Sequence, residues 1–115
     1  MSTEWLVVVR DTPVNNRMEH RPQHFADSPP KFTANGGKVI MGGGIFNSDK
    51  PLVADGSQPL PPFAGSAFVI RAESKQEVID FLKQDVYARE KVWDMDNLEI
   101  WPYLCAYREE KTFKA

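Results

Sequence analysis

The N-terminal segment Trp5–Arg10 constrains the fold most, because it is apolar on both of its alternating faces. Trp5, Val7 and Val9 share one face, and Leu6 and Val8 share the other. Successive side chains of a strand point to opposite faces of a sheet, so such a strand must be covered on both sides. Segments 64–72 and 98–107 are also apolar on both faces. We therefore expect a sheet with helices on one face and a second apolar layer on the other.

Turn and capping signals divide the rest of the chain. The expected order is strand 5–10, a helical region within 14–35, strand 38–46, strand 64–72, helix 75–84, a short helix 86–92 and strand 98–107. Ser74 and Glu77 form a capping box at the start of the second helix. Pro102 donates no hydrogen bond, so the last strand should lie at an edge or be bulged.

This βαββαβ order is that of the ferredoxin-like α+β fold, a four-stranded antiparallel sheet with both helices on one face. The other face of the sheet would be left bare, although the strands are apolar there as well. A large exposed apolar face indicates a partner surface, and two sheets packed face to face in a homodimer would cover it.

Three segments carry signals that complicate this pattern. Pro22 suits the first turn of a helix that begins near Arg21, and Asp27-Ser28-Pro29-Pro30 should kink or split that helix, since proline lacks an N–H and clashes with the preceding turn. The run Gly42-Gly43-Gly44 indicates either a bulge or a close approach of the backbone to a ligand. The proline-rich connection 47–63 is expected to be either a lid or disordered.

Composition excludes several classes of protein. The chain has 115 residues, 42% of them hydrophobic, which is the size of one domain over residues 1–115. The net charge is −2 without a basic block, so no nucleic acid is expected as a partner. A single cysteine, Cys105, gives no disulfide framework and is expected to be a small buried hydrophobe in a reducing compartment. The first apolar run is too short to span a bilayer, which predicts a cytoplasmic protein with no membrane partner.

The segment Arg21-Pro22-Gln23-His24 holds the strongest candidate for chemistry. Histidine gives or takes a proton near neutral pH more readily than any other side chain. A helix start beside it would add free N–H donors, and Arg17 and Arg21 would add positive charge for an anionic oxygen. The alternative is that His24 is an ordinary surface residue. His20, one turn earlier, is a weaker candidate for the same role.

Several motifs in a fixed order resemble those of the YCII-related family, within the dimeric α+β barrel superfamily that also contains muconolactone isomerase-like proteins. They are Arg21-Pro22-Gln23-His24, the strand Gly37–Gly43, Gly65-Ser66 at the start of the third strand, Asp85-Val86-Tyr87, and Glu99–Tyr103 in the last strand. The resemblance implies a single dimeric α+β barrel domain in which the histidine and aspartate of these motifs, here His24 and Asp85, form a pair in the active cleft. Some relatives are dehydrochlorinases of chlorinated hydroquinones, and others are thought to be lyases or isomerases.

Two departures separate the chain from the family pattern. Val86 stands where the family has the proline of an Asp-Pro-Tyr segment. The first helix also has two extra residues around 27–30, which would reshape the cleft. The substrate of the relatives is therefore not carried over to this chain.

With that resemblance, the residues predict a lyase or isomerase that acts by proton transfer, elimination or cyclisation on an aromatic, lactone or polyketide-like molecule. His24 would be the general base, and Asp85, which is also suited to cap a helix, would orient it. The candidate substrate-binding residues are Arg21, Arg10, Gly43, Ser66, Tyr87, Trp101 and Tyr103. We expect an aromatic pocket lined by Trp5, Phe68, Trp101 and Tyr103, although dimer core is an alternative role for these side chains.

No cofactor is expected, and two histidines with one cysteine give no metal-ligand spacing. Two other classes of function stay open. A non-catalytic small-molecule-binding dimer would need the cavity without the His24–Asp85 pair. A hydrolase or dehydrochlorinase would in addition need a water ordered beside His24.

Overall fold

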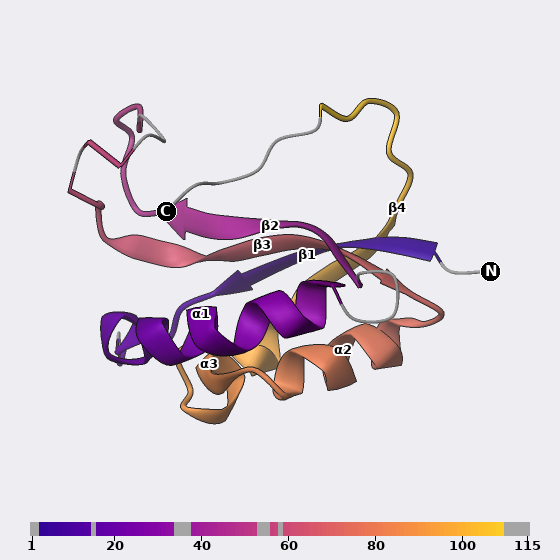
Figure 1. Cartoon of the computed structure of the whole chain (residues 1–115), viewed down its shortest axis with the longest axis horizontal. Coiled ribbons are helices and arrows are strands. Elements are labelled where there is room, and N and C mark those ends of the chain that lie inside the picture. Colours follow the sequence, from indigo (N-terminus) through magenta and orange to yellow (C-terminus); the bar gives the residue numbers. More distant parts are fainter. Residues whose placement is uncertain (1–2, 15, 34–37, 53–55, 58, 110–115) are drawn as a thin grey trace.

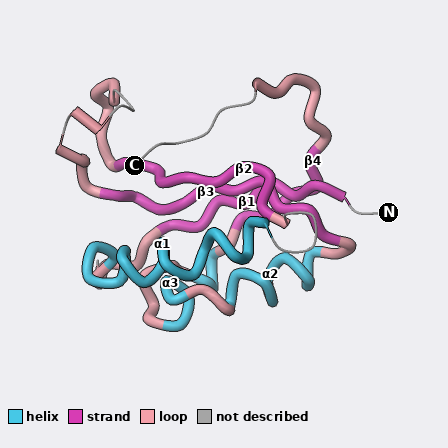
Figure 2. Tube along the Cα trace, in the orientation of Figure 1, coloured by secondary structure: helices cyan, strands magenta, loops and turns pink. Residues whose placement is uncertain are grey.

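The computed structural model describes residues 3–14, 16–33, 38–52, 56–57 and 59–109. Its elements are β1 (Thr3–Arg10), α1 (Arg17–Thr33), β2 (Val39–Phe46), β3 (Phe63–Ala72), α2 (Lys75–Lys83), α3 (Val86–Arg89), a 3-10 turn η2 (Met95–Asn97) and β4 (Glu99–Tyr103). The strands form one antiparallel sheet in the order β2-β3-β1-β4. The helices lie on one face of this sheet (Figures 1 and 2). The predicted ferredoxin-like α+β fold is confirmed.

The core lies between the sheet and the helices. Strand register places Val7 opposite Phe68, and these side chains meet Val78 and Leu82 of α2 and Tyr87 of α3 in one buried cluster. Burial of apolar side chains contributes about 1.5–3 kcal/mol each, so this cluster accounts for much of the driving force that places the helices on the sheet.

The opposite face of the sheet carries apolar side chains that no helix covers. Leu6 and Val8 alternate with the core residues of β1, and Leu6 pairs across the strands with Trp101 of β4. Trp101 is 46% exposed and Met41 is 56% exposed. Residues 104–109 pass on this side of the sheet (Figure 1), where Arg108 bonds to Glu4 at 2.6 Å. This face has the apolar character that the sequence predicted for it.

The first helix differs from the prediction of a kinked or split element. It begins at Arg17, before the start near Arg21 that Pro22 suggests, and continues through Pro29 and Pro30 to Thr33. Proline fixes φ near a value that a helix accepts, but it costs one hydrogen bond and a clash with the preceding turn. Because α1 begins at Arg17, His24 lies in the middle of the helix, and the expected N–H donors of a helix start are not beside it.

The glycine run of β2 makes room for two aromatic rings of β3. A Cβ atom at Gly42 would lie 2.8 Å from the Phe68 ring, and one at Gly44 would lie 2.5 Å from the Phe63 ring. The register shifts fall at the ends of the strand, between Val39 and Met41 and beside Phe46, rather than within the glycines. Close packing under Gly42 and Gly44 is therefore the structural reason for this run.

The capping signals in the second half of the chain form as expected. Ser74 accepts a hydrogen bond from the Glu77 N–H at 3.1 Å, and the Glu77 carboxylate accepts one from the Glu73 N–H at 2.6 Å. Pro102 lies in β4, an edge strand of the sheet. Within the described residues, no helix is long and apolar enough to cross a membrane. Residues 53–55 and 58 of the connection predicted as a lid or disordered lie outside the described residues.

Candidate active site

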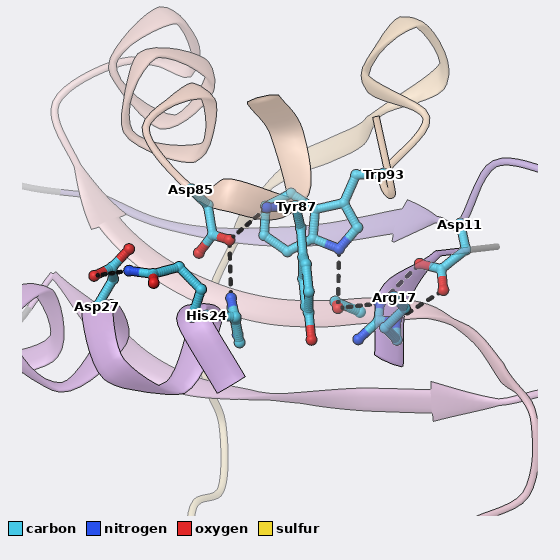
Figure 3. A network of polar contacts seen from close by, with 9 residues as sticks. Asp11, Arg17, His24, Asp27, Asp85, Tyr87 and Trp93 are labelled. Carbon is cyan, nitrogen blue, oxygen red and sulfur yellow. Dashed lines mark hydrogen bonds and ion pairs between the residues drawn. The ribbon is translucent and has the colours of Figure 1, made fainter. Parts of the chain in front are cut away.

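The structure brings His24 of α1 and Asp85 at the start of α3 together. Nδ1 of His24 lies 2.8 Å from Oδ1 of Asp85, and the two side chains are 14% and 11% exposed (Figure 3). The same Oδ1 accepts a hydrogen bond from the Tyr87 N–H at 2.9 Å, so Asp85 also caps α3. An ionised carboxylate only accepts hydrogen bonds, so the ring nitrogen that faces it carries the proton. The basic lone pair of a neutral His24 then resides on Nε2.

Tyr87 lies between the histidine and a buried arginine. Its ring stacks on the His24 ring with centroids 4.2 Å apart and planes inclined by 8°, and Cζ of Arg17 lies 4.7 Å from the Tyr87 centroid. Figure 3 shows His24 and Arg17 on opposite sides of the Tyr87 ring. Trp93 closes the cluster with its ring 5.5 Å from Tyr87 in an edge-on arrangement. These contacts fix the orientation of the His24 ring through a side chain that is itself buried.

The guanidinium of Arg17 is held by Asp11, which follows β1, and by Ser66 of β3. Its Nε and Nη2 atoms donate to the two carboxylate oxygens of Asp11 at 2.7 and 2.8 Å, and Nη2 also donates to Oγ of Ser66 at 2.8 Å. The Ser66 hydroxyl accepts a second hydrogen bond from the Trp93 indole at 3.1 Å. Bidentate contact with a carboxylate and a serine fixes both the position and the plane of the guanidinium group.

Sequence reasoning missed Asp11 and Trp93, and it treated Arg17 only as a source of positive charge. Asp11 directly follows the first strand, and nothing in the local sequence links it to an arginine six residues later. The contact arises because a bridge between Asp11 and Trp93 extends the sheet beyond β1. The signal that could have found Arg17 is helical periodicity, since residues 17, 21 and 24 share one face of α1.

Three of the predicted binding residues lie in or beside this cluster. Ser66 and Tyr87 belong to it directly, and both are buried. The guanidinium of Arg21 stacks over the Phe25 ring at 4.6 Å, and its charge acts on the Tyr87 hydroxyl.

The other four predicted binding residues do not lie near His24 and Asp85. Arg10, Gly43, Trp101 and Tyr103 lie on the face of the sheet opposite the helices. Arg10 forms an exposed ion pair with Glu99 at 3.6 Å, and a Cβ atom at Gly43 would have open space around it. The expectation of one aromatic pocket is also wrong, because its four residues lie on two faces of the sheet. Trp5 and Phe68 face the helices, whereas Trp101 and Tyr103 face away from them. Side chains on opposite faces of one sheet cannot line a single cavity within a chain.

No group of three or more His, Cys, Asp or Glu side chains that could hold a metal ion occurs among the residues that the model describes. A neutral imidazole oriented by a carboxylate can remove a proton, and nearby guanidinium groups can stabilise the negative charge that forms.

Burial raises the pKa of the Tyr87 hydroxyl above its ordinary value of 10.0, against the opposing effect of Arg17 and Arg21. The unfolded chain then loses this proton at a lower pH than the folded chain, so folding stability falls as the pH rises above about 10. We expect Tyr87→Phe to reduce this alkaline loss of stability. Urea unfolding between neutral pH and about pH 11 measures it. Tyr107→Phe, in an exposed position, is the control. An equal alkaline slope in all three proteins would contradict this prediction.

The chain is similar in sequence to proteins that are named for fungal biosynthesis pathways. It is 33% identical over 109 residues to aspercryptin biosynthesis cluster protein B of Emericella nidulans, covering 91% of this chain and 65% of that protein. It is 30% identical over 102 residues to fusaric acid biosynthesis protein 2 of Gibberella fujikuroi, covering 87% of this chain and 91% of that protein. The chain belongs to the family of fusaric acid biosynthesis protein 2.

A solved structure shares the fold at much lower identity. It is the 5-chloro-2-hydroxyhydroquinone dehydrochlorinase TftG of Burkholderia phenoliruptrix AC1100, in complex with 2,5-dihydroxybenzoquinone. The TM-score is 0.66 with 18% identity, and the match covers 88% of this chain and 93% of TftG. No family model matches the chain, so the resemblance to the YCII-related family stays a prediction.

Proposed function

We propose that the protein is a cofactor-independent lyase or isomerase that transfers a proton on a small aromatic, quinoid or polyketide-like molecule. The contact between His24 and Asp85 at 2.8 Å carries this proposal. His24 acts as the general base through Nε2, and Asp85 holds the ring in the tautomer that makes Nε2 basic. The stacked ring of Tyr87 keeps the imidazole in place.

The relatives support the class of substrate. Two of them carry names from biosynthesis clusters, and TftG was solved with a hydroxylated quinone. Hydroxylated quinones and polyketides share acidic C–H or O–H groups beside carbonyls, and removal of such a proton leaves charge on an oxygen. A histidine base beside two arginines suits this chemistry better than it suits hydrolysis of an unactivated amide or ester.

The proposal is tested by hydrogen exchange on a probe. We expect the wild-type protein to accelerate deuterium exchange from D2O into the ring C–H positions of 2,5-dihydroxybenzoquinone, followed by NMR. His24→Asn should slow this exchange by about 100-fold or more, the usual contribution of a general base. His20→Asn is the matched control and should keep the rate, because His20 is not the partner of Asp85.

Other results discriminate the alternatives. Binding of the probe without exchange above the buffer rate would contradict proton transfer and favour the non-catalytic binding function. Equal rates in wild type and His24→Asn would exclude His24 as the base. Asp85→Asn should also slow exchange, because an amide can present its NH2 group to the ring and favour the other tautomer.

We further propose that the uncovered face of the sheet packs against a second copy of the chain. The exposed apolar residues Met41, Trp101 and Tyr103 lie on this face, and apolar surface of this kind is stabilised by burial in an interface. Light scattering after size exclusion should give twice the mass of one chain for the wild type. Trp101→Asp should shift the protein toward the monomer, and Lys75→Asp, on the exposed start of α2, should not. A monomeric wild type would contradict the proposal.

A further inference from the structure

Arg17 has a donor group that the surrounding protein does not use. Nε and Nη2 are fully engaged by Asp11 and Ser66, as described above. Nη1 donates to no acceptor within the described part of the chain, although the Arg17 side chain is only 5% exposed. A buried guanidinium with one free edge is the form that anion-binding arginines take.

The surroundings of Arg17 hold that edge in one position. Cζ lies 4.7 Å from the ring centroids of both Phe63 and Tyr87. Two aromatic contacts and a bidentate carboxylate leave the guanidinium little freedom, so an incoming anion would not have to order it. Asp11 balances the charge of Arg17, and Arg21, whose charge also acts on Tyr87, supplies the remaining positive charge nearby.

We propose that Nη1 of Arg17 binds an anionic oxygen of the substrate, either a carboxylate or a phenolate. The inference rests on the proposed function, because it assigns the charged end of the molecule whose proton His24 removes. Figure 3 shows the hydroxyl end of Tyr87 between the His24 ring and the Arg17 guanidinium. A substrate at this edge would meet the base on one side of Tyr87 and the anion-binding group on the other. Such a substrate would need an anionic oxygen and an acidic proton far enough apart to reach the two sides of the Tyr87 ring.

The test uses pairs of probes that differ in charge. 4-Nitrophenolate and benzoate represent the two anions, and 4-nitroanisole and benzamide are their neutral counterparts. Each is titrated into 15N-labelled wild-type protein, and the side-chain N–H signals of the arginines are followed by NMR. We expect at least one anion to bind about tenfold more tightly than its neutral counterpart and to shift the Arg17 guanidinium signals most. Which anion does so identifies the carboxylate or the phenolate as the preferred group.

Two variants test whether the preference for anionic probes comes from Arg17. Arg17→Lys keeps a charge but loses the fixed edge, and it should lose the tenfold preference for the anion. Arg10→Gln removes an exposed arginine from the opposite face and should leave the preference unchanged. Should Arg17→Lys fail to fold, the wild-type titration still decides. Equal affinity for anions and neutral probes, or shifts at Arg10 or Arg108 instead of Arg17, would overturn the proposal.

The titration of anions at Arg17 and the exchange test of His24 can succeed or fail separately. Anion-dependent shifts at Arg17, with deuterium exchange that His24→Asn leaves unchanged, would establish the anion site and exclude His24 as the base. Exchange that requires His24, with no anion preference at Arg17, would establish the base and exclude the anion site.

Discussion

Replacing Asp11 by alanine is expected to lower the free energy of unfolding by about 3–5 kcal/mol. The side chains of Asp11 and Arg17 are 6% and 5% exposed, so removal of the carboxylate leaves a buried guanidinium without its counter-charge. The cost comes mainly from that uncompensated charge rather than from the lost attraction. Urea unfolding of the two proteins measures the difference.

Two controls separate this cause from a general loss of contacts. The double variant Asp11→Ala with Arg17→Met should be more stable than Asp11→Ala alone, because no charge is then buried unpaired. Glu4→Ala breaks the partly exposed ion pair with Arg108 and should cost less than about 1 kcal/mol. An Asp11→Ala variant as stable as Glu4→Ala would show that the buried pair contributes little.

Replacing Tyr87 by alanine is expected to destabilise the protein by about 3–5 kcal/mol, the usual cost of removing a large aromatic side chain from a core. Tyr87 is 1% exposed and contacts the rings of His24 and Trp93 and the guanidinium of Arg17. Its loss would leave a cavity between α1 and α3. Thermal and urea unfolding measure the change in stability.

Tyr107→Ala is the matched control, since that side chain is exposed, and it should change the stability by less than about 0.5 kcal/mol. Tyr87→Phe keeps the ring and should be much more stable than Tyr87→Ala near neutral pH. A Tyr87→Ala variant that unfolds with the wild type would show that the stacked arrangement of Tyr87 on His24 does not form in solution.

The elements that could be predicted from the sequence are those with local signals. The Ser74–Glu77 box and the Asp85 cap each fix a helix start through side chain to backbone contacts within four residues. The order of strands and helices then follows from hydrophobic alternation, and βαββαβ order leaves few arrangements of the sheet. The position of Asp85 beside His24 was predicted through the family resemblance, because no local rule connects two residues 61 positions apart.

The face of the sheet that carries the site could not be predicted. Trp5, Val7 and Val9 are apolar, and so are Leu6 and Val8, so alternation alone does not say which set faces the helices. The aromatic residues of β4 were therefore assigned to a pocket that lies on the other side of the sheet. The start of α1 was missed for a related reason. Proline rules place a helix start near Pro22 and a break at Pro29-Pro30, whereas α1 runs through both places from Arg17 to Thr33.

Oδ1 of Asp85 accepts hydrogen bonds both from the ring of His24 and from the backbone N–H of Tyr87. The first turn of α3 and the side chain of the proposed base therefore both depend on the same carboxylate oxygen. Local opening of α3 would release both at once, so the base can be correctly placed only while that short helix is formed.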